Sequence, residues 1–306
     1  MNRTAKRRTF FYYLKNDWDL YVMILPAIVL FFIFKYIPMY GVTIAFKKYD
    51  LVKGIFASDW VGFKYFVQFF NDPYFFRIVK NTLMINVYSL IFVFPAPAVL
   101  ALLLNELKSE RLKRIAQSFS YLPHFISTVV VVGILMKLAA TDGVINALLG
   151  SLGLPEQSFF GDARWFRTLY ISSDIWQGVG WGSILYLAAL TGVPLDRYEA
   201  AVIDGANRWQ QMKHITLPGI MPTIVILFIL NMGHMLEVGF EKVYLMYNPA
   251  IYDTADVIST YVYRRGIQGL DFGYAAAIGL FDSVVAFILL VTVNQMSKKL
   301  GQESLW

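Results

Sequence analysis

Residues 197–218 read RYEAAVIDGANRWQQMKHITLP, and they form a polar stretch between two long apolar runs. Asp196, just before the stretch, can cap a short helix that ends near Ile203. Gly205 suits the position just past that end, because glycine adopts a positive φ at no steric cost. The first half therefore predicts a short helix that is closed by a glycine hinge.

The second half of the stretch carries its own helix signals. Asn207 can cap a second short helix from Arg208 to Ile215. Pro218 then permits a new helical start, since proline is tolerated in the first turn of a helix. A connection that only joins two membrane spans does not need two ordered pieces, so this stretch is a candidate functional site.

The composition around this stretch indicates an integral membrane protein. Of 306 residues, 57% are hydrophobic and only 16% are charged, against about a quarter charged in soluble domains. Aromatic residues make up 17%, which suits belts at two membrane interfaces. The formal charge of +6 is not gathered in one patch, so it does not indicate a nucleic-acid surface. The absence of cysteine excludes disulfides, zinc–thiolate sites and thiol chemistry.

Six apolar runs approach the roughly 20 residues that a membrane-spanning helix needs. The predicted spans are 20–45, 82–104, 119–139, 168–190, 219–240 and 274–296. The first follows a basic tail but is too long for the apolar core of a signal peptide, and it is predicted to be retained. The predicted fold class is all-α, a polytopic membrane protein with tails 1–19 and 297–306, a membrane domain 20–296, and the connecting loop 193–218 between spans 4 and 5.

Two features modify the spans and loops. Pro95 and Pro97 predict a kink in the second span. In the loop before it, 46–79, Phe63, Phe66 and Phe70 recur at helical spacing, which predicts a short interfacial helix.

Lysine and arginine set the expected orientation. The two tails, the connection between spans 2 and 3, and the 193–218 loop hold fourteen of these residues, whereas the three longer opposite loops hold ten. By the positive-inside rule, this bias predicts that the tails and the 193–218 loop lie in the cytoplasm.

The spacing within 197–218 resembles the EAA loop of binding-protein-dependent ABC importer permeases. The resemblance lies in Glu199-Ala200-Ala201, the glycine four residues after them, and Leu217-Pro218. It implies a coupling helix that sits in a cleft of a separate ATPase subunit. The coupling residues it implies are Glu199, Ala200, Ala201, Asp204, Gly205, Leu217 and Pro218. The alternative is an amphipathic helix on the membrane surface, with the apolar side Tyr198, Val202, Trp209 and Met212.

Other strings extend the resemblance to a carbohydrate-uptake branch that imports alginate, rhamnogalacturonan and related oligosaccharides. They are FKYIPMYG at 34–41, FPAPAVLALLLNEL at 94–107, SYLPHFIS at 120–127, ADVISTYVYRRG at 255–266 and the terminal SLW. The resemblance implies a bacterial cell-membrane protein that works by alternating access. Its implied partners are a second homologous permease, two ATPase subunits that bind ATP and Mg, an extracytoplasmic solute-binding protein and an oligosaccharide.

No motif in the sequence indicates an enzyme. There is no G-x-x-x-x-G-K-[ST] string, no H-E-x-x-H spacing and no G-x-S-x-G elbow. The three histidines lie far apart in the sequence. We therefore expect no catalytic residue, no metal site and no cofactor in this chain, and any catalysis is expected of a partner.

Polar side chains within the spans are the candidate substrate pathway, since a charge at the bilayer centre costs about 2.5–3.5 kcal/mol on insertion scales. The candidates are Asp174, Gln177 and Trp181 in span 4, Asn231, His234 and Glu237 in span 5, and Asp282 in span 6. Sugar hydroxyls donate to carboxylates, and the C–H faces of sugars pack on aromatic rings. The alternative is that these groups hydrogen-bond between helices and hold the bundle together.

Two other functions remain open at this point. A secondary transporter would use Asp174, Glu237 or Asp282 as a proton or sodium site, and it predicts an internal repeat that the sequence does not show. It would also have no use for an ordered 197–218 loop. A membrane scaffold or sensor predicts no sugar flux.

Overall fold

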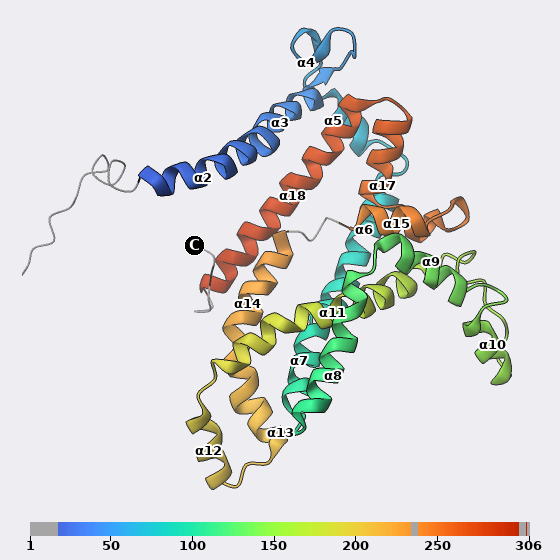
Figure 1. The fold of residues 1–306 in the computed structure, drawn as a ribbon. Helices are drawn as coiled ribbons and strands as arrows, with labels where there is room; N and C mark the ends of the chain where they lie inside the picture. Colours follow the sequence, from blue (N-terminus) through green and yellow to red (C-terminus); the bar gives the residue numbers. More distant parts are fainter. Residues whose placement is uncertain (1–17, 234–237, 300–303, 305–306) are drawn as a thin grey trace, which may run out of the picture.

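The computed structural model describes residues 18–233, 238–299 and 304, which are mostly helical (Figure 1). Within these residues, four helical runs are long and apolar enough to span a membrane: Trp18–Phe46, Phe75–Asn105, Arg208–Gly233 and Phe272–Lys299. Two more candidates are bent pairs, Glu110–Phe125 with Thr128–Leu138 and Ala163–Thr191 with Leu195–Ile203. Counting each bent pair as one span gives six, in agreement with the prediction.

The secondary structure of the described residues is almost entirely helical. The α-helices are α2 (Trp18–Phe31), α3 (Ile37–Met39), α4 (Gly54–Ala57), α5 (Lys64–Phe70), α6 (Phe75–Tyr88), α7 (Ala96–Asn105), α8 (Glu110–Tyr121), α9 (Thr128–Leu138), α10 (Val144–Ser151), α11 (Phe166–Thr191), α12 (Leu195–Ile203), α13 (Arg208–Gln211), α14 (Leu217–Gly233), α15 (Phe240–Met246), α16 (Tyr252–Ala255), α17 (Ile258–Tyr263) and α18 (Phe272–Lys299). Shorter π-helical or 3-10 turns are η1 (Phe32–Tyr36), η2 (Tyr40–Phe46), η3 (Ser89–Val93), η4 (Leu122–Phe125), η5 (Met212–Thr216), η6 (Pro249–Ile251) and η7 (Arg264–Gln268). One antiparallel ladder among the described residues, β1 (Lys47–Lys48) with β2 (Asp59–Trp60), was not predicted.

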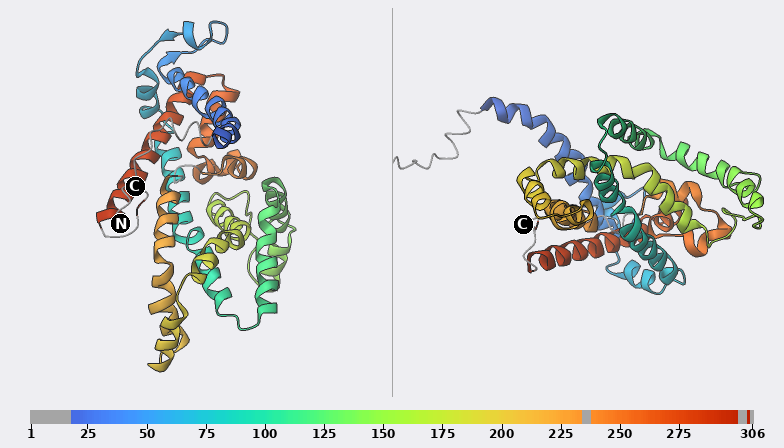
Figure 2. Two further views of the ribbon diagram at one scale, coloured as in Figure 1. Left: turned by 60° about the vertical axis from the view of Figure 1, so that its left-hand side comes forward. Right: turned by 90° about the horizontal axis from the view of Figure 1, so that it is seen from below.

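The molecule has two distinct ends (Figures 1 and 2). At one end lie α12, α13 and the connection from α7 to α8, and at the other lie α4 and the β-ladder. Arg208 at the start of α13 forms an ion pair of 3.3 Å with Glu106 just after α7. The basic connection between spans 2 and 3 and the 197–218 stretch therefore share one end, which we call the α12 end.

Span 3 is not the single straight helix that was predicted. It begins earlier, at Glu110, where Ser109 accepts a hydrogen bond from the Leu112 amide, and it bends by 102° before Thr128. The chain restarts at Ser127, whose hydroxyl accepts from the Val130 amide. A polar cap in the middle of an apolar run is a local signal for this break.

Span 5 also differs from the prediction. Pro218 does not start a new helix, because the run from Arg208 to Gly233 is continuous. The π-helical turn η5 precedes the proline, and the Leu217 amide bonds back to the Met212 carbonyl. Proline lacks an amide hydrogen, and the wider turn accommodates it without ending the helix. The helix is described as far as Gly233, and residues 234–237 lie outside the described residues. Val238 and Gly239 are not helical and a separate helix, α15, starts at Phe240, so the predicted end of span 5 at Phe240 is wrong.

Span 2 is irregular at its prolines: the π-helical turn η3 ends two residues before Pro95, and α7 begins directly after that proline. The predicted kink itself stays a prediction. The short helix predicted from Phe63, Phe66 and Phe70 is present, as α5. The residue that packs this helix on the rest of the chain is Phe69, which is 1% exposed while Phe63 is 69% exposed. Phe69 packs edge-to-face against Phe75 and Phe281, which tie α5 to spans 2 and 6.

Two acidic groups, one buried and one half-buried, fix the end opposite α12. Asp256, fully buried, pairs with Arg264 at 2.8 Å and Arg77 at 3.3 Å. Asp72, in the turn before α6, accepts from the hydroxyls of Tyr261 and Tyr274 at 2.5 and 2.7 Å. Burial raises the pKa of Asp72, but the hydrogen bonds it accepts outweigh burial and lower that pKa overall. These contacts hold α16 and α17 on spans 2 and 6.

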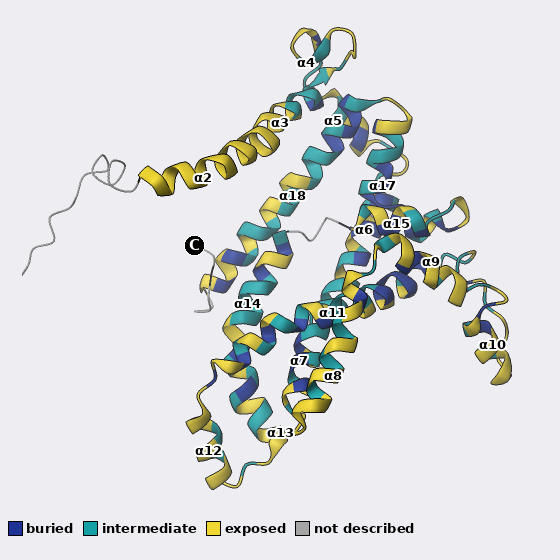
Figure 3. Ribbon diagram, in the orientation of Figure 1, coloured by how far each residue is buried: buried dark blue, intermediate teal, exposed yellow. Residues whose placement is uncertain are grey.

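Glycines bring α11 close to two neighbouring spans. A Cβ on Gly180 would lie 2.0 Å from the Ser120 carbonyl oxygen of α8, and one on Gly182 would lie 2.8 Å from Pro97 of α7. Small residues at such crossings allow membrane helices to approach closely. Figure 3 shows the consequence: α11 carries buried residues along its length, whereas α2 is exposed throughout.

This crossing gives a test of the packing. Gly180→Ala should lower the free energy of unfolding by about 1–3 kcal/mol, because α8 and α11 must separate to admit the methyl group. Gly178→Ala is the matched control, since its Cβ would meet nothing within 4 Å. Thermal unfolding of both purified variants checks this, and equal melting temperatures for the two would contradict the packing described.

Candidate functional site

The first helix of the 197–218 stretch, α12, starts by a different device from the one predicted. Pro194 occupies its N-cap position without any side-chain cap, and Asp196 lies within the first turn instead of capping it. Proline's fixed φ already prepares the chain for a helical turn. An acidic residue in a first turn still interacts favourably with the helix dipole. The predicted end at Ile203 is confirmed.

Gly205 closes α12 in the left-handed conformation, with φ at +78°. The Ala206 amide bonds to the Ala201 carbonyl at 2.8 Å, and the Gly205 amide to the Val202 carbonyl at 3.1 Å. This pair of bonds is a Schellman motif, which satisfies the carbonyl groups at the end of a helix. The predicted glycine hinge is therefore present, with Asp204 as the C-cap residue.

Asn207 opens α13, as predicted. Its side chain accepts from the Gln210 amide at 2.9 Å, and the Gln210 side chain accepts from the Asn207 amide at 2.8 Å. This reciprocal capping box satisfies two amide groups at the helix start. Both sides of the four-residue turn between α12 and α13 are thus fixed by local hydrogen bonds.

Two contacts fix α12 to the start of span 5. The Tyr198 hydroxyl donates to Thr216 Oγ1 at 2.9 Å. Gly219, directly after Leu217 and Pro218, lies against Val193, where a Cβ would be 2.7 Å from the valine side chain. The Leu-Pro-Gly sequence therefore lies at the base of α12, where span 5 passes the end of span 4.

The outer surface of this unit is apolar and exposed. Leu195, Val202, Ile203 and Trp209 are 74%, 62%, 86% and 68% exposed, and Glu199 and Ala200 are exposed beside them. Between the two helical pieces is a notch of about 370 Å³, lined in part by Asp204, Gln210 and His214. The alternative apolar side does not form one face, because Tyr198 and Met212 are half-buried while Val202 and Trp209 are exposed.

In span 4, Asp174 forms an ion pair of 2.5 Å with Lys242 of α15. The lysine side chain is 6% exposed, and its ammonium also lies 5.4 Å from the centre of the Tyr170 ring. From the sequence, Lys242 is expected only in a loop. This pair joins α11 to α15, a contact between helices of the kind given as the alternative; the substrate contact of Asp174 stays a prediction.

Gln177 and Trp181 both reach the bend in span 3. Gln177 Nε2 donates to the Ile126 carbonyl at 3.0 Å, which satisfies a backbone group where the helix is interrupted. Trp181 stacks on His124 with ring centres 4.6 Å apart and an interplanar angle of 1°, and it meets Phe125 edge-to-face. Trp181 stays 47% exposed, so part of the residue remains accessible.

Of the other four pathway candidates, the structure describes only two. Asn231 is exposed on α14, and Asp282 is half-buried on α18. His234 and Glu237 lie outside the described residues. In the part of the chain that is described, no group of three or more histidine, cysteine or acidic residues could hold a metal ion.

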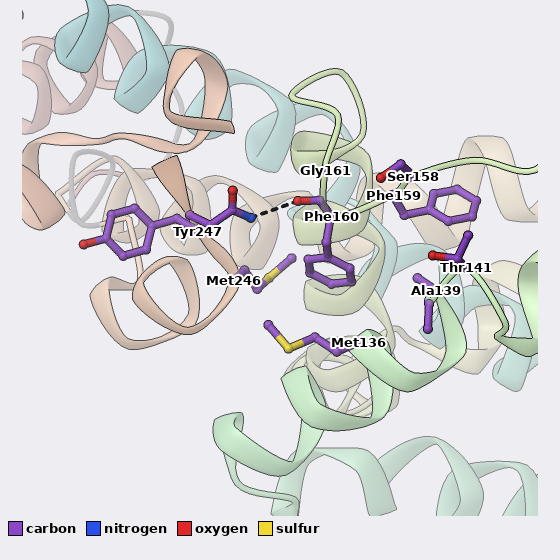
Figure 4. Close-up of a pocket in the computed structure, with 11 residues that line it drawn as sticks. Met136, Ala139, Thr141, Ser158, Phe159, Phe160, Gly161, Met246 and Tyr247 are labelled. Carbon is purple, nitrogen blue, oxygen red and sulfur yellow. Dashed lines mark hydrogen bonds between the residues drawn. The ribbon is translucent and has the colours of Figure 1, made fainter. Parts of the chain in front are cut away.

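A separate pocket of about 340 Å³ lies where the end of α9 meets α15 (Figure 4). Met136, Phe160 and Met246 turn toward one another in it, and Asn248 closes one side by donating to the Phe160 carbonyl at 2.9 Å. The residues that line it carry no charge. It offers nothing that would recognise a charged ligand.

Comparison with known proteins places these features in a family. The family model for the binding-protein-dependent transport system inner membrane component matches residues 93–301. Protein LplB of Bacillus subtilis (strain 168) is 49% identical over 96% of this chain and 92% of its own length. The polygalacturonan/rhamnogalacturonan transport system permease protein YteP of the same organism is 44% identical over 99% and 95%. A bacterial alginate ABC transporter, solved with a periplasmic protein that holds an alginate pentasaccharide, has a chain with a TM-score of 0.90, 43% identity, and coverage of 97% of this chain and 100% of its own.

The Asp174–Lys242 pair gives a test of its structural role. Asp174→Asn should lower the free energy of unfolding by about 3 kcal/mol, because it leaves the lysine buried without a carboxylate. The double variant Asp174→Asn with Lys242→Met should recover most of that loss. If thermal unfolding shows the double variant to be less stable than either single variant, the pair does not hold α11 to α15.

Proposed function

This chain belongs to the family of binding-protein-dependent transport system inner membrane components, and on that premise we propose that it forms one half of the membrane channel of an ATP-driven oligosaccharide importer. A second, homologous permease supplies the other half. Two ATPase subunits bind ATP and Mg, and a solute-binding protein outside the membrane delivers the oligosaccharide.

The observation that carries the proposal is the exposed, rigid unit of α12 and α13. Four large apolar side chains at the tip of an otherwise polar loop form a surface that a partner protein can cover. The Schellman motif and the capping box fix its shape before any partner binds. Such preorganisation lets a partner push on the unit without first ordering it.

The motion of α12 reaches the membrane through α11, which ends only four residues before it. The two helices meet at an angle of 72°. Closure of the ATPase dimer moves α12 and tilts α11 with its packed neighbours, which exposes the pathway to one side of the membrane and then to the other. The α12 end accordingly faces the cytoplasm, together with both tails.

The substrate class follows from the relatives. Two of those named above are a polygalacturonan/rhamnogalacturonan transport permease and an alginate transporter, which supports the import by this chain of oligosaccharides derived from complex polysaccharides. The Trp181 ring, still partly open beside Gln177, supplies the aromatic surface on which a sugar face packs.

Ion-coupled transport is less well supported. A proton or sodium site needs an acidic group that is free to exchange its ion, whereas Asp174 is held by Lys242 at 2.5 Å. The ordered unit at the α12 end would also have no purpose in a carrier that uses no ATP.

Substitutions of Gly205 test whether the 197–218 stretch binds the ATPase or is an ordinary loop. A Cβ there would meet nothing within 4 Å, so a substitution acts only through the positive φ, which costs an L-residue roughly 1–2 kcal/mol. Gly205→Val should lose ATPase from the purified importer while the melting temperature of the permease pair changes little. Gly205→Asn is the matched control, since asparagine tolerates this conformation. ATPase retained equally by both variants would show that Gly205 is an ordinary loop glycine.

A further inference from the structure

A groove of about 480 Å³ lies between the end of α6 and the first half of α11. Its walls are Tyr88 and the exposed ring of Phe92 on one side and α11 on the other, with the hydroxyls of Thr168 and Ser172 and the guanidinium groups of Arg164 and Arg167. Among the described residues, no acidic side chain lines it. Its volume falls within the usual range for small-ligand sites.

The two arginines differ in how their charge is balanced. Arg164 is 86% exposed and pairs with Asp162 at 2.6 Å, so its charge is already neutralised. Arg167 donates from Nη2 to the Asn81 amide oxygen at 2.9 Å, and no carboxylate lies within ion-pair distance of it among the described residues. A neutral amide positions the guanidinium but does not cancel its charge. Within the described part of the chain, Arg167 is therefore a positioned cation of the groove that has no counter-ion.

Asn81 is itself fixed. Its Nδ2 donates to the carbonyls of Asp253 and Asp256, both at 3.0 Å, and the asparagine is 1% exposed. Arg167 therefore bonds to an amide whose orientation is fixed by its own hydrogen bonds. This preorganisation favours a ligand that accepts from the remaining guanidinium N–H groups, as a carboxylate does in a charge-assisted pair.

Arg167 also lies on the face of α11 that carries the pathway candidates. It precedes Asp174 by seven residues and Trp181 by fourteen, which is close to two and four helical turns. Arg167, and with it the groove, is therefore about two helical turns nearer than Asp174 to the end of α11 opposite α12. In the proposed importer, that is the end at which substrate enters.

We propose that this groove binds an acidic sugar residue, with the sugar carboxylate on Arg167 and the apolar face of the sugar ring on Tyr88 or Phe92. The hydroxyls of Thr168 and Ser172 are placed to bond the hydroxyls of the sugar. This inference rests on the proposed import of oligosaccharides and adds that acidic sugars are recognised, and where. A phospholipid phosphate would match the cation, but it would leave the hydroxyls and the aromatic rings unused.

The test measures equilibrium binding to the permease–ATPase assembly in nanodiscs, without the binding protein. The probes are trigalacturonate and trimannuronate, each beside its uncharged methyl ester. Wild type should bind at least one acid trimer more tightly than its ester. Arg167→Gln should weaken that binding by roughly tenfold or more and leave ester binding unchanged, whereas Arg167→Lys should lose less.

One control variant and one further groove variant accompany this measurement. Lys64→Gln removes an exposed charge on α5, outside the groove, and should change neither trimer, which excludes a general effect of charge. Phe92→Leu should weaken acid and ester alike, because ring packing does not depend on the carboxylate. If Arg167→Gln fails to fold, Phe92→Leu still tests the groove, and unchanged binding of both probes in that variant would overturn the proposal.

The remaining outcomes also decide the matter. Equal acid binding by wild type and a folded Arg167→Gln variant would overturn the proposal, as would equal binding of acid and ester by wild type. Loss of bound phosphatidylglycerol from Arg167→Gln in native mass spectrometry, with sugar binding intact, would make the groove a lipid site. Failure of the whole importer to take up any oligosaccharide would instead refute the proposed function, which is a different result from uptake without acid preference.

Discussion

The close approach of α11 to spans 2 and 3 is the constraint on which the rest of the structure depends. At Gly180 there is room only for a hydrogen atom beside the Ser120 backbone, and Gly182 is nearly as close to Pro97. With α11 held there, its other side chains have fixed positions. Asp174 meets α15, Gln177 meets the interrupted backbone at Ile126, and the helix end delivers α12 at a set angle.

Helix α11 therefore connects two regions of different character, one at each of its ends. At one end, local hydrogen bonds around Gly205 hold α12 and α13 as a rigid unit that exposes apolar side chains. At the other, Arg167 and the Asp174–Lys242 pair are charges fixed by buried partners. Because protein interiors are close-packed, a shift of the helix is transmitted as a rigid-body movement and is not absorbed locally. The bends of spans 3 and 4 are the places where such a movement can be accommodated.

Much of this arrangement could be predicted from the sequence, wherever a local rule applied. Apolar length predicted the spans, and Gly205 and Asn207 predicted the end of one helix and the start of the next. The rules failed where non-local contacts decided the outcome. The Gln177 amide that bonds the Ile126 carbonyl comes from another span, and the buried position of Lys242 depends on Asp174, 68 residues earlier. Pro218 was read as a helix start because nothing in the local sequence reveals a π-helical turn before it.

The central claim, that a partner ATPase covers the exposed side chains of α12, can be measured directly because the chain has no cysteine. A single cysteine in place of Ile203, which is 86% exposed, can be labelled with a maleimide in the intact importer and again after the ATPase is removed. A cysteine in place of Leu152, 74% exposed just after α10, serves as the reference. The account predicts slow labelling at position 203 in the importer, fast labelling once the ATPase is gone, and no change at position 152. Equally fast labelling at position 203 in both preparations would contradict it.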